Sequence, residues 1–304
     1  MKTARTDVRL WILSDLHLEL TRGWDLPGPA ERPAFDVLII AGDLVPKMER
    51  GVRWLIERVD KPCIYVPGNH EFYGCDVDRT VEKARAAAAG SQIHILQNDA
   101  VDLGGGITFL GATLWTDFDL FGDAEYAMMA AGDTMNDYRK IRTHNYRRQL
   151  RPAHTLKRNL ESRDFIAREL RKGGRNVVVT HHGPVPQAAR RGFERDISSA
   201  AYWWLTASIH GSGTNGRIGR CLAIATPAST SSSVARSATN RLSGPISKTS
   251  IHADRADTTS GWPNRAMSPR MFLPNQESSA PILRATPIIF RVNLLPSKIM
   301  NSCR

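Results

Sequence analysis

The stretch Asp36-Val37-Leu38-Ile39-Ile40-Ala41-Gly42-Asp43 decides the fold class of this chain. Its unbroken apolar run ends abruptly in a glycine and a carboxylate. A short continuous run of this kind is typical of a strand buried on both faces of a sheet. In open α/β sheets, ligands gather just beyond the carboxyl ends of the strands. The stretch therefore predicts a buried strand with a functional residue, Asp43, at its exit.

Other segments repeat this pattern along the first two hundred residues. Further strands are predicted at Val8–Leu13, Cys63–Val66, Ile93–Leu96, Ile107–Leu114 and Asn176–Thr180. Helical patterning falls between them, at Met48–Val59, Asp76–Ala89 and about Ala153–Leu170. Gly104-Gly105-Gly106 is interpreted as a hairpin turn, because no helix start follows it as a phosphate loop would require. Apolar strands separated by helices predict an α/β fold with helices packed on the sheet faces.

Metal-competent side chains follow four of these strands. They are Asp15 and His17, then Asp43, then Asn69 and His70, and finally His181 and His182. Neighbouring strands bring such clusters together in space. Mixed carboxylate, imidazole and amide donors suit Mn, Fe or Zn. A lone carboxylate after Gly42 has two oxygens with which to bridge two cations.

Each of these pieces is commonplace when taken alone. An Asp-x-His tripeptide arises by chance, and Gly42-Asp43 is also what a turn contains. Asn69-His70-Glu71 suits a helix cap, and paired histidines occur on surfaces. Four such clusters in this order, each at the exit of a predicted strand, favour a metal centre over these alternatives.

Residues 8–182 resemble the calcineurin-like metallophosphoesterase superfamily, in particular its small bacterial members. The matching motifs are Ser14-Asp15-Leu16-His17, Ala41-Gly42-Asp43, Pro67-Gly68-Asn69-His70-Glu71 and Val178-Val179-Thr180-His181-His182. The resemblance implies a calcineurin-like α/β sandwich with two divalent metal ions (Mn, Fe or Zn). It also implies a metal-dependent hydrolase that acts on phosphate esters.

The resemblance further implies a role for each motif residue. Asp15 and His17 hold the first metal, Asp43 bridges both, and Asn69 holds the second together with His181 or His182. We favour His181 as the ligand because it directly follows the strand, which leaves His182 nearer the substrate. His70 does not ligate and instead protonates the leaving-group oxygen.

Two other sites are open to more than one interpretation. Glu71 or backbone carbonyls are expected to orient the metal-binding residues by hydrogen bonds, without contacting the metals themselves. Asp137 and Tyr138 lie in an insertion, where they either cover the site or form a solvated helix cap.

The composition divides the chain at about residue 202. The chain has 304 residues and a formal net charge of +11. Residues 203–304 contain twelve Lys and Arg against three Asp and Glu, and they are rich in Ser, Thr and Pro. We therefore expect an incomplete metallophosphoesterase domain over residues 1–202, followed by a poorly ordered basic tail. Such a tail is the one region in which we expect nucleic-acid binding, although it lacks aromatic residues interleaved with its bases.

Location and redox state follow from what the sequence lacks. No apolar run approaches the ~18 residues of a membrane helix. No signal peptide precedes the first strand, so we expect a cytoplasmic protein without a membrane partner. The four cysteines, Cys63, Cys75, Cys221 and Cys303, are too few and too scattered for a disulfide scaffold, so reduced thiols are expected.

The superfamily ends its site with a Gly-His-x-His motif that this sequence lacks. The nearest histidine, His210, precedes its glycine, and His252 is isolated. A reading-frame shift near Trp203 accounts for this, because regrouping the codons of Leu222–Thr226 yields Gly-His-x-His for suitable codon choices. The alternative is a divergent C-terminal domain. Three functions follow: a phosphoesterase impaired by the missing motif, a non-catalytic remnant of one, or a nucleic-acid-binding protein.

Overall fold

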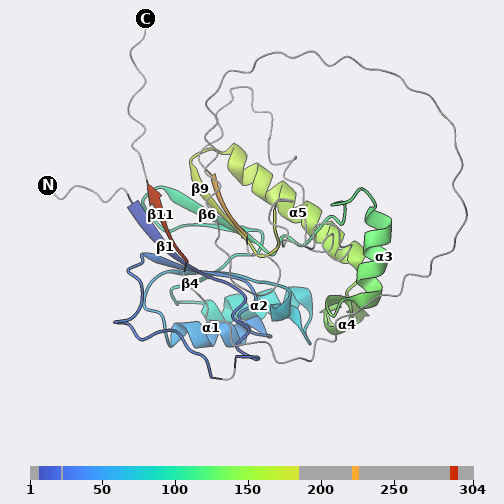
Figure 1. Cartoon of the computed structure of the whole chain (residues 1–304), viewed down its shortest axis with the longest axis horizontal. Coiled ribbons are helices and arrows are strands. Elements are labelled where there is room, and N and C mark those ends of the chain that lie inside the picture. The colour runs from blue at the N-terminus through green and yellow to red at the C-terminus, as the bar shows by residue number, and fades with distance from the viewer. Residues whose placement is uncertain (1–6, 22, 185–220, 226–287, 294–304) are drawn as a thin grey trace, which may run out of the picture. The chain divides into compact units, whose positions relative to one another are not determined.

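The computed structural model describes residues 7–21, 23–184, 221–225 and 288–293, and its centre is a pair of sheets (Figure 1). The first sheet has the strand order β11-β1-β2-β3-β4. Strands β1 to β4 run parallel, and β11 pairs antiparallel with β1. Their bounds are β1 Asp7–Leu13, β2 Val37–Ala41, β3 Cys63–Val66, β4 Ile93–Ile95 and β11 Ile288–Asn293.

The second sheet has the order β10-β9-β6-β5. Strand β9 lies parallel to both β6 and β10, and β5 forms an antiparallel hairpin with β6. The bounds are β5 Asp99–Asp102, β6 Ile107–Ala112, β9 Arg175–Thr180 and β10 Cys221–Ala225. Because β9 ends at Thr180, His181 and His182 leave the second sheet at the carboxyl end of one of its parallel strands.

Helices cover the outer faces of the two sheets (Figure 1). Helices α1 (Met48–Ile56) and α2 (Val77–Ala88) belong to the same apolar cluster as the outward side chains of the first sheet. Helix α5 (Pro152–Arg171) packs Phe165 and Ile166 against the outer face of the second sheet. The remaining elements are the 3-10 turn η1 His70–Phe72, α3 Ala124–Thr134, α4 Asp137–Lys140, and the short hairpin of β7 Arg142–Thr143 and β8 Arg148–Gln149.

Alternation along β2 shows how the layers are built. Val37, Ile39 and Ala41 pack into the cluster between the sheets, together with Phe109 of β6 and Val179 of β9. Leu38 and Ile40, in contrast, pack toward the helices. All five residues of β2 are buried, which is why the run reads as continuously apolar. The architecture is a sandwich of two sheets between helical layers, and the predicted α/β fold class is confirmed.

The structure adds elements that the sequence pattern did not predict. Gly104–Gly106 does form a hairpin turn, but its first strand is β5 and not the predicted Ile93–Leu96, which is β4. The insertion that contains Asp137 holds α3, α4 and the β7–β8 hairpin. Strands β10 and β11 lie within residues 203–304, where no strand was predicted.

Several expectations fall on residues that the structure does not describe. They concern the boundary at residue 202, the frame shift near Trp203, His210 and His252, and most of the basic tail. Within the described residues, no helix is both long and apolar enough to cross a membrane. Cys63 and Cys75 are buried free thiols, as predicted for reduced cysteines.

Candidate metal centre

The loops after β1 and β2 run side by side and bring their polar residues together. The backbone N–H of Asp15 donates to the carbonyl of Gly42, and that of His17 donates to the carbonyl of Asp43. Asp15, His17 and Asp43 all have positive φ, between 44° and 56°. Non-glycine residues adopt this region rarely, and such conformations cluster at functional sites. The backbone is thus bent to direct three donors to one place.

Two glycines give the site its close packing. A Cβ on Gly42 would collide with the imidazole of His181, and one on Gly68 would collide with the carboxylate of Asp43. Gly42 also has a φ of 91°, a backbone conformation that residues with a side chain rarely adopt. The glycines of the two motifs therefore let Asp43 and His181 approach each other.

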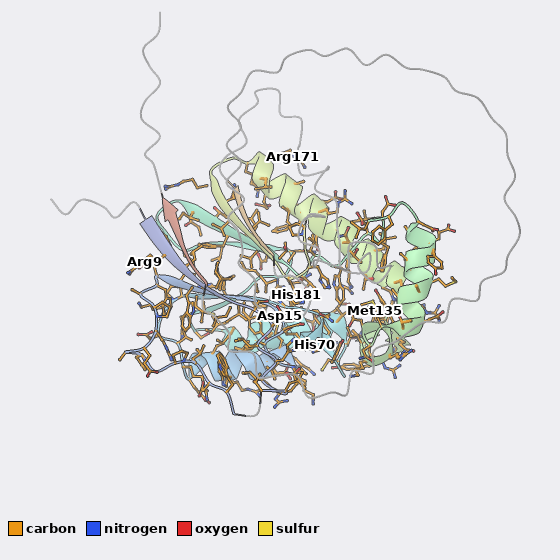
Figure 2. The ribbon with its side chains drawn as sticks, in the orientation of Figure 1. Arg9, Asp15, His70, Met135, Arg171 and His181 are labelled. Carbon is orange, nitrogen blue, oxygen red and sulfur yellow. The ribbon has the colours of Figure 1, made fainter. Side chains whose placement is uncertain are left out.

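Asp43 belongs to two groups of donors that could each hold an ion. The first group is Asp15, Asp43 and His181, and the second is His17, Asp43 and His70. Within each group the donor atoms lie within 4.8 Å of one another. Figure 2 shows Asp15, His70 and His181 close together at the centre of the molecule. The carboxylate of Asp43 is thus shared between the two groups.

His181 is oriented by the backbone behind it. Its Nδ1 donates to the carbonyl of Ala41 at 2.9 Å, which leaves Nε2 directed at Asn69 Oδ1, 3.2 Å away, and at Asp43 Oδ2, 3.5 Å away. Fixing one ring nitrogen in this way sets the tautomer of a metal-binding histidine. His182 points elsewhere: its Nδ1 lies 3.0 Å from the carbonyl of Thr113 and its ring stacks on Trp115.

Asn69 is held by Asp137, for which the sequence left open a position over the site or a solvated helix cap. Its amide nitrogen donates to Asp137 Oδ1 at 2.8 Å, and this bond turns Asn69 Oδ1 toward His181. Tyr73 donates its hydroxyl to the same Asp137 oxygen at 2.7 Å. Asp137 is buried, so it is not a solvated helix cap. Tyr138 is also buried, within hydrogen-bond distance of Thr155, and takes no part in the centre.

Residues 8–208 match the sequence profile of the calcineurin-like phosphoesterase family. The chain belongs to this family. It is also 26% identical, over 198 residues, to uncharacterized protein L509 of Acanthamoeba polyphaga mimivirus, with 57% of this chain and 67% of the viral protein covered. The family is one of hydrolases that act on phosphate esters and are typically metal-dependent.

Glu71 of the phosphoesterase fold anchors the loops beneath the metal centre. It is completely buried and accepts hydrogen bonds from the backbone N–H groups of Asp43, Leu44 and Gly68. Its Oε1 also accepts the hydroxyl of Tyr65 at 2.8 Å. A buried carboxylate is stable only when it is paired or hydrogen-bonded, as this one is. Glu71 thus supports the ligands from behind, in line with the expectation from the sequence.

His70 lies on the more exposed side of the centre. Its backbone N–H donates to Asp43 Oδ1 at 2.9 Å, while its ring stacks on Tyr73. Its Nδ1 lies 3.4 Å from Glu19 Oε1, and Nδ1 of His17 lies 3.5 Å from the same oxygen. Burial opposes ionisation of Glu19, but its bonds to the two histidines dominate and lower its pKa to about 2. Glu19 is therefore an ionised partner of both rings, and no sequence motif had indicated it.

The carboxylates of Asp15 and Asp43 lie close together, and this concentration of negative charge suits a cation. Burial raises the pKa of Asp15, and the neighbouring charge of Asp43 adds to this. Burial disfavours the charged imidazole of His181, yet the carboxylates of Asp43 and Asp15 overcome it and raise the pKa of His181 to about 10. A protonated His181 offsets only part of the negative charge that Asp43 and Asp15 can carry. The donor set of carboxylate, imidazole and amide fits a divalent metal such as Mn, Fe or Zn.

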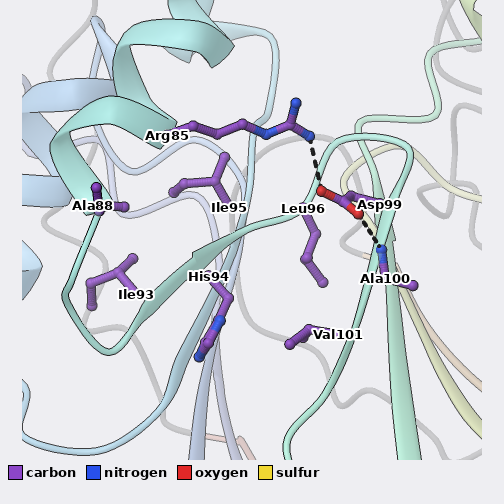
Figure 3. A pocket seen from close by; sticks show the side chains of 10 residues that line it. Arg85, Ala88, Ile93, His94, Ile95, Leu96, Asp99, Ala100 and Val101 are labelled. Carbon is purple, nitrogen blue, oxygen red and sulfur yellow. Dashed lines mark hydrogen bonds and ion pairs between the residues drawn. The ribbon is translucent and has the colours of Figure 1, made fainter.

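A separate cavity lies along the edge strands β4 and β5 (Figure 3). Its volume is about 270 Å³ and its lining includes Arg85, His94 and Asp99. Arg85 and Asp99, which both line it, form an ion pair of 3.2 Å. None of the seven predicted site residues lines this cavity, so it is distinct from the metal centre.

Proposed function

We propose that this chain hydrolyses phosphate esters at a centre that holds two divalent cations. The observation that carries the proposal is the position of Asp43, whose carboxylate belongs to both donor groups. Family membership supports the same reaction class. In this proposal Asp15 and His17 bind the first cation, Asn69 and His181 bind the second, and Asp43 bridges them. The donor groups divide these residues differently, since Asp15 shares a group with His181 and His17 shares the other with His70.

Ester hydrolysis needs three contributions, and the chain's residues serve each of them. Two cations, when bound, neutralise the phosphoryl oxygens and lower the pKa of a bound water. The carboxylates of Asp43 and Asp15 serve as proposed ligands of the cations. Asp137 keeps the amide oxygen of Asn69 facing the centre. His70 is partly exposed at the edge of the centre, and its proposed role is to protonate the leaving oxygen. His182 is buried against Trp115, and its proposed place is behind the substrate pocket.

Hydrolysis of bis-p-nitrophenyl phosphate and p-nitrophenyl phosphate by the purified full chain tests the proposal. We expect activity that requires Mn²⁺, Fe²⁺ or Zn²⁺ and disappears with a chelator. A non-catalytic remnant would bind metal and leave both esters intact, and that result would refute the proposed activity.

The missing Gly-His-x-His motif predicts how the activity depends on metal concentration. Fewer protein ligands loosen the cations and the water they position, and catalysis is sensitive to displacements of about 1 Å. We expect little activity at micromolar Mn²⁺ and partial recovery at millimolar Mn²⁺. A variant with the frame restored after Trp203 is expected to be active at micromolar metal. Equal activity of both chains at micromolar metal would refute the frame-shift hypothesis.

A further inference from the structure

A strongly basic segment borders the metal centre. Residues 139–158 contain eight Lys and Arg and not one Asp or Glu. The segment runs from α4 through the β7–β8 hairpin into the first turns of α5. It is named the basic hairpin below. Its charge is separate from that of residues 203–304, which contain twelve Lys and Arg against three Asp and Glu.

Most of this charge is displayed to solvent. Seven of the eight side chains are exposed and Arg158 is half-buried: Arg139, Lys140, Arg142, Arg147, Arg148, Arg151, Lys157 and Arg158. Arg158 pairs with Asp78, and Lys157 pairs with Glu161. Among the residues that the structure describes, no carboxylate pairs with Arg142, Arg147 or Arg148. Burial, and then His144 and the arginines around it, lower the pKa of His154, which reports the positive potential at this surface.

The tip of the hairpin is held in a fixed position. The backbone N–H of Tyr146 donates to Asp76, a completely buried carboxylate that also caps α2. Arg79 donates to the side chain of Asn145 at 2.7 Å. Nζ of Lys83 lies 3.4 Å from the hydroxyl of Tyr146 and 5.8 Å from its ring centroid. Tyr146 nevertheless remains 44% exposed, so one aromatic ring is displayed among the bases.

The basic hairpin is connected directly to the metal centre. Nζ of Lys140 lies 5.1 Å from the ring centroid of Tyr73, and that ring stacks on His70 at 4.3 Å. The backbone N–H of Gly74 donates to the carbonyl of Lys140, and that of Arg142 donates to the carbonyl of Cys75. The segment that carries Asn69 and His70 is thus hydrogen-bonded to the start of the hairpin. Positive charge begins two side chains away from the proposed acid.

We infer that the basic hairpin binds the flanking phosphates of a single-stranded nucleic acid whose scissile phosphodiester lies in the metal centre. The inference rests on the proposed function, which supplies the hydrolytic site. Proteins that bind single strands combine a basic surface that follows the backbone with aromatic rings on which bases stack. Arg142, Arg147 and Arg148 supply the first property, and Tyr146 supplies the second. A lipid surface can also take up both the charge and the ring, so binding to vesicles is one of the outcomes that the test below distinguishes.

Binding of a fluorescein-labelled single-stranded DNA oligomer to the full chain tests the inference. The measurement is made with a chelator present, so that no cleavage occurs. The test variant is Arg147→Gln/Arg148→Gln. Its charge-matched control is Arg168→Gln/Arg171→Gln at the end of α5, where Figure 2 labels Arg171. Both proteins keep residues 203–304 unchanged, so any contribution of that region to binding cancels.

We expect the hairpin variant to bind about tenfold more weakly at moderate salt, and the control to bind as the unaltered chain does. Two lost phosphate contacts should also lower the slope of log affinity against log salt by about 1.4, because each contact to a single strand contributes about 0.7. Tyr146→Ala should weaken binding about tenfold without changing that slope, since stacking is not ionic. Equal losses in hairpin and control variants would overturn the inference.

A second readout locates the contact itself. An oligomer that contains 5-iodouracil, photolysed on the unaltered chain, should cross-link to the tryptic peptide that carries Tyr146. Cross-links confined to residues 203–304 would overturn the inference. So would hairpin-dependent binding to phosphatidylserine vesicles without hairpin-dependent binding to the oligomer, since the partner would then be a membrane. Failure of the proposed function appears separately, as absence of bis-p-nitrophenyl phosphate hydrolysis by the unaltered chain.

Discussion

The two donor groups that share Asp43 differ in how firmly the fold holds them. In the group of Asp15, Asp43 and His181, the His181 side chain is only 7% exposed and is anchored to the carbonyl of Ala41. In the other group, the side chains of His17 and His70 are 22% and 26% exposed, and Glu19 faces both rings. The buried half is held by the carbonyl of Ala41 and by Asn69, whereas the two histidines of the open half are partly exposed to solvent. We therefore expect the buried half to hold its cation more firmly, and the open half, with His17 as a proposed ligand and His70 as the proposed acid, to face the substrate.

Removing the carboxylate that the two halves share should have the largest effect. We expect Asp43→Asn to abolish activity and to lower the bound metal, because a neutral amide cannot balance two cations. Metal analysis and ester hydrolysis on the same sample measure both. Asp60→Asn, an exposed carboxylate remote from the centre, is the control and should behave as the unaltered chain. Full activity in Asp43→Asn would contradict the shared-carboxylate assignment.

Substituting one histidine in each half tests whether the two halves have different roles. His181→Ala should lose metal, because it removes a ligand from the buried half. His70→Ala should retain metal and turn over about 10²–10⁴-fold more slowly, the usual loss for a general acid. The loss should shrink for p-nitrophenyl esters, whose leaving group needs little protonation. Metal loss in His70→Ala would show that it is a ligand of the open half and not an acid.

Lowering the pH should weaken metal binding by the buried half, because protons compete with the cation for His181. Without metal the pKa of His181 is raised to about 10, so the ring carries a proton at neutral pH. A cation must displace that proton, so metal affinity should rise about tenfold per pH unit between about pH 6 and pH 8. Calorimetric titration in two buffers of different ionisation enthalpy counts the proton released. An affinity independent of pH over this range would mean that His181 does not ligate.

Asp137 should matter less, because it acts through Asn69. Asp137→Leu removes the acceptor and should lower metal affinity about 10–100-fold, the usual cost of losing a partner that orients a ligand. Asp137→Asn keeps an oxygen at the position that accepts from both Asn69 and Tyr73, so it should restore most of the affinity. If the two variants bind metal equally well, Asp137 has no positioning role.

The sequence allowed the strands and their exits to be predicted because both depend on local pattern. Val37–Ala41 is apolar throughout since both faces of β2 are buried, and Asp43 follows at once. Strand β5 was missed because Asp99 and Asp102 are exposed at a sheet edge and leave only two small apolar residues between them.

The contacts between distant segments were beyond local pattern. Asp137 meets Asn69 across 68 residues, and no spacing indicates that encounter. Glu19 follows the Asp-x-His motif closely, but nothing in the sequence shows that its carboxylate faces two histidines. The grouping of Asp15 with His181 likewise depends on how the strand exits are juxtaposed in three dimensions. The types of residue at the strand ends predicted which side chains could bind metal. Only the fold shows which of these side chains lie close together.

Electron paramagnetic resonance of the full chain with two equivalents of Mn²⁺ tests the central claim most directly, because it reports whether one carboxylate joins two ions. The account predicts the spectrum of an exchange-coupled manganese pair in the unaltered chain, and its disappearance in Asp43→Asn. A spectrum of isolated, uncoupled manganese in the unaltered chain, with two ions bound, would contradict the shared role of Asp43.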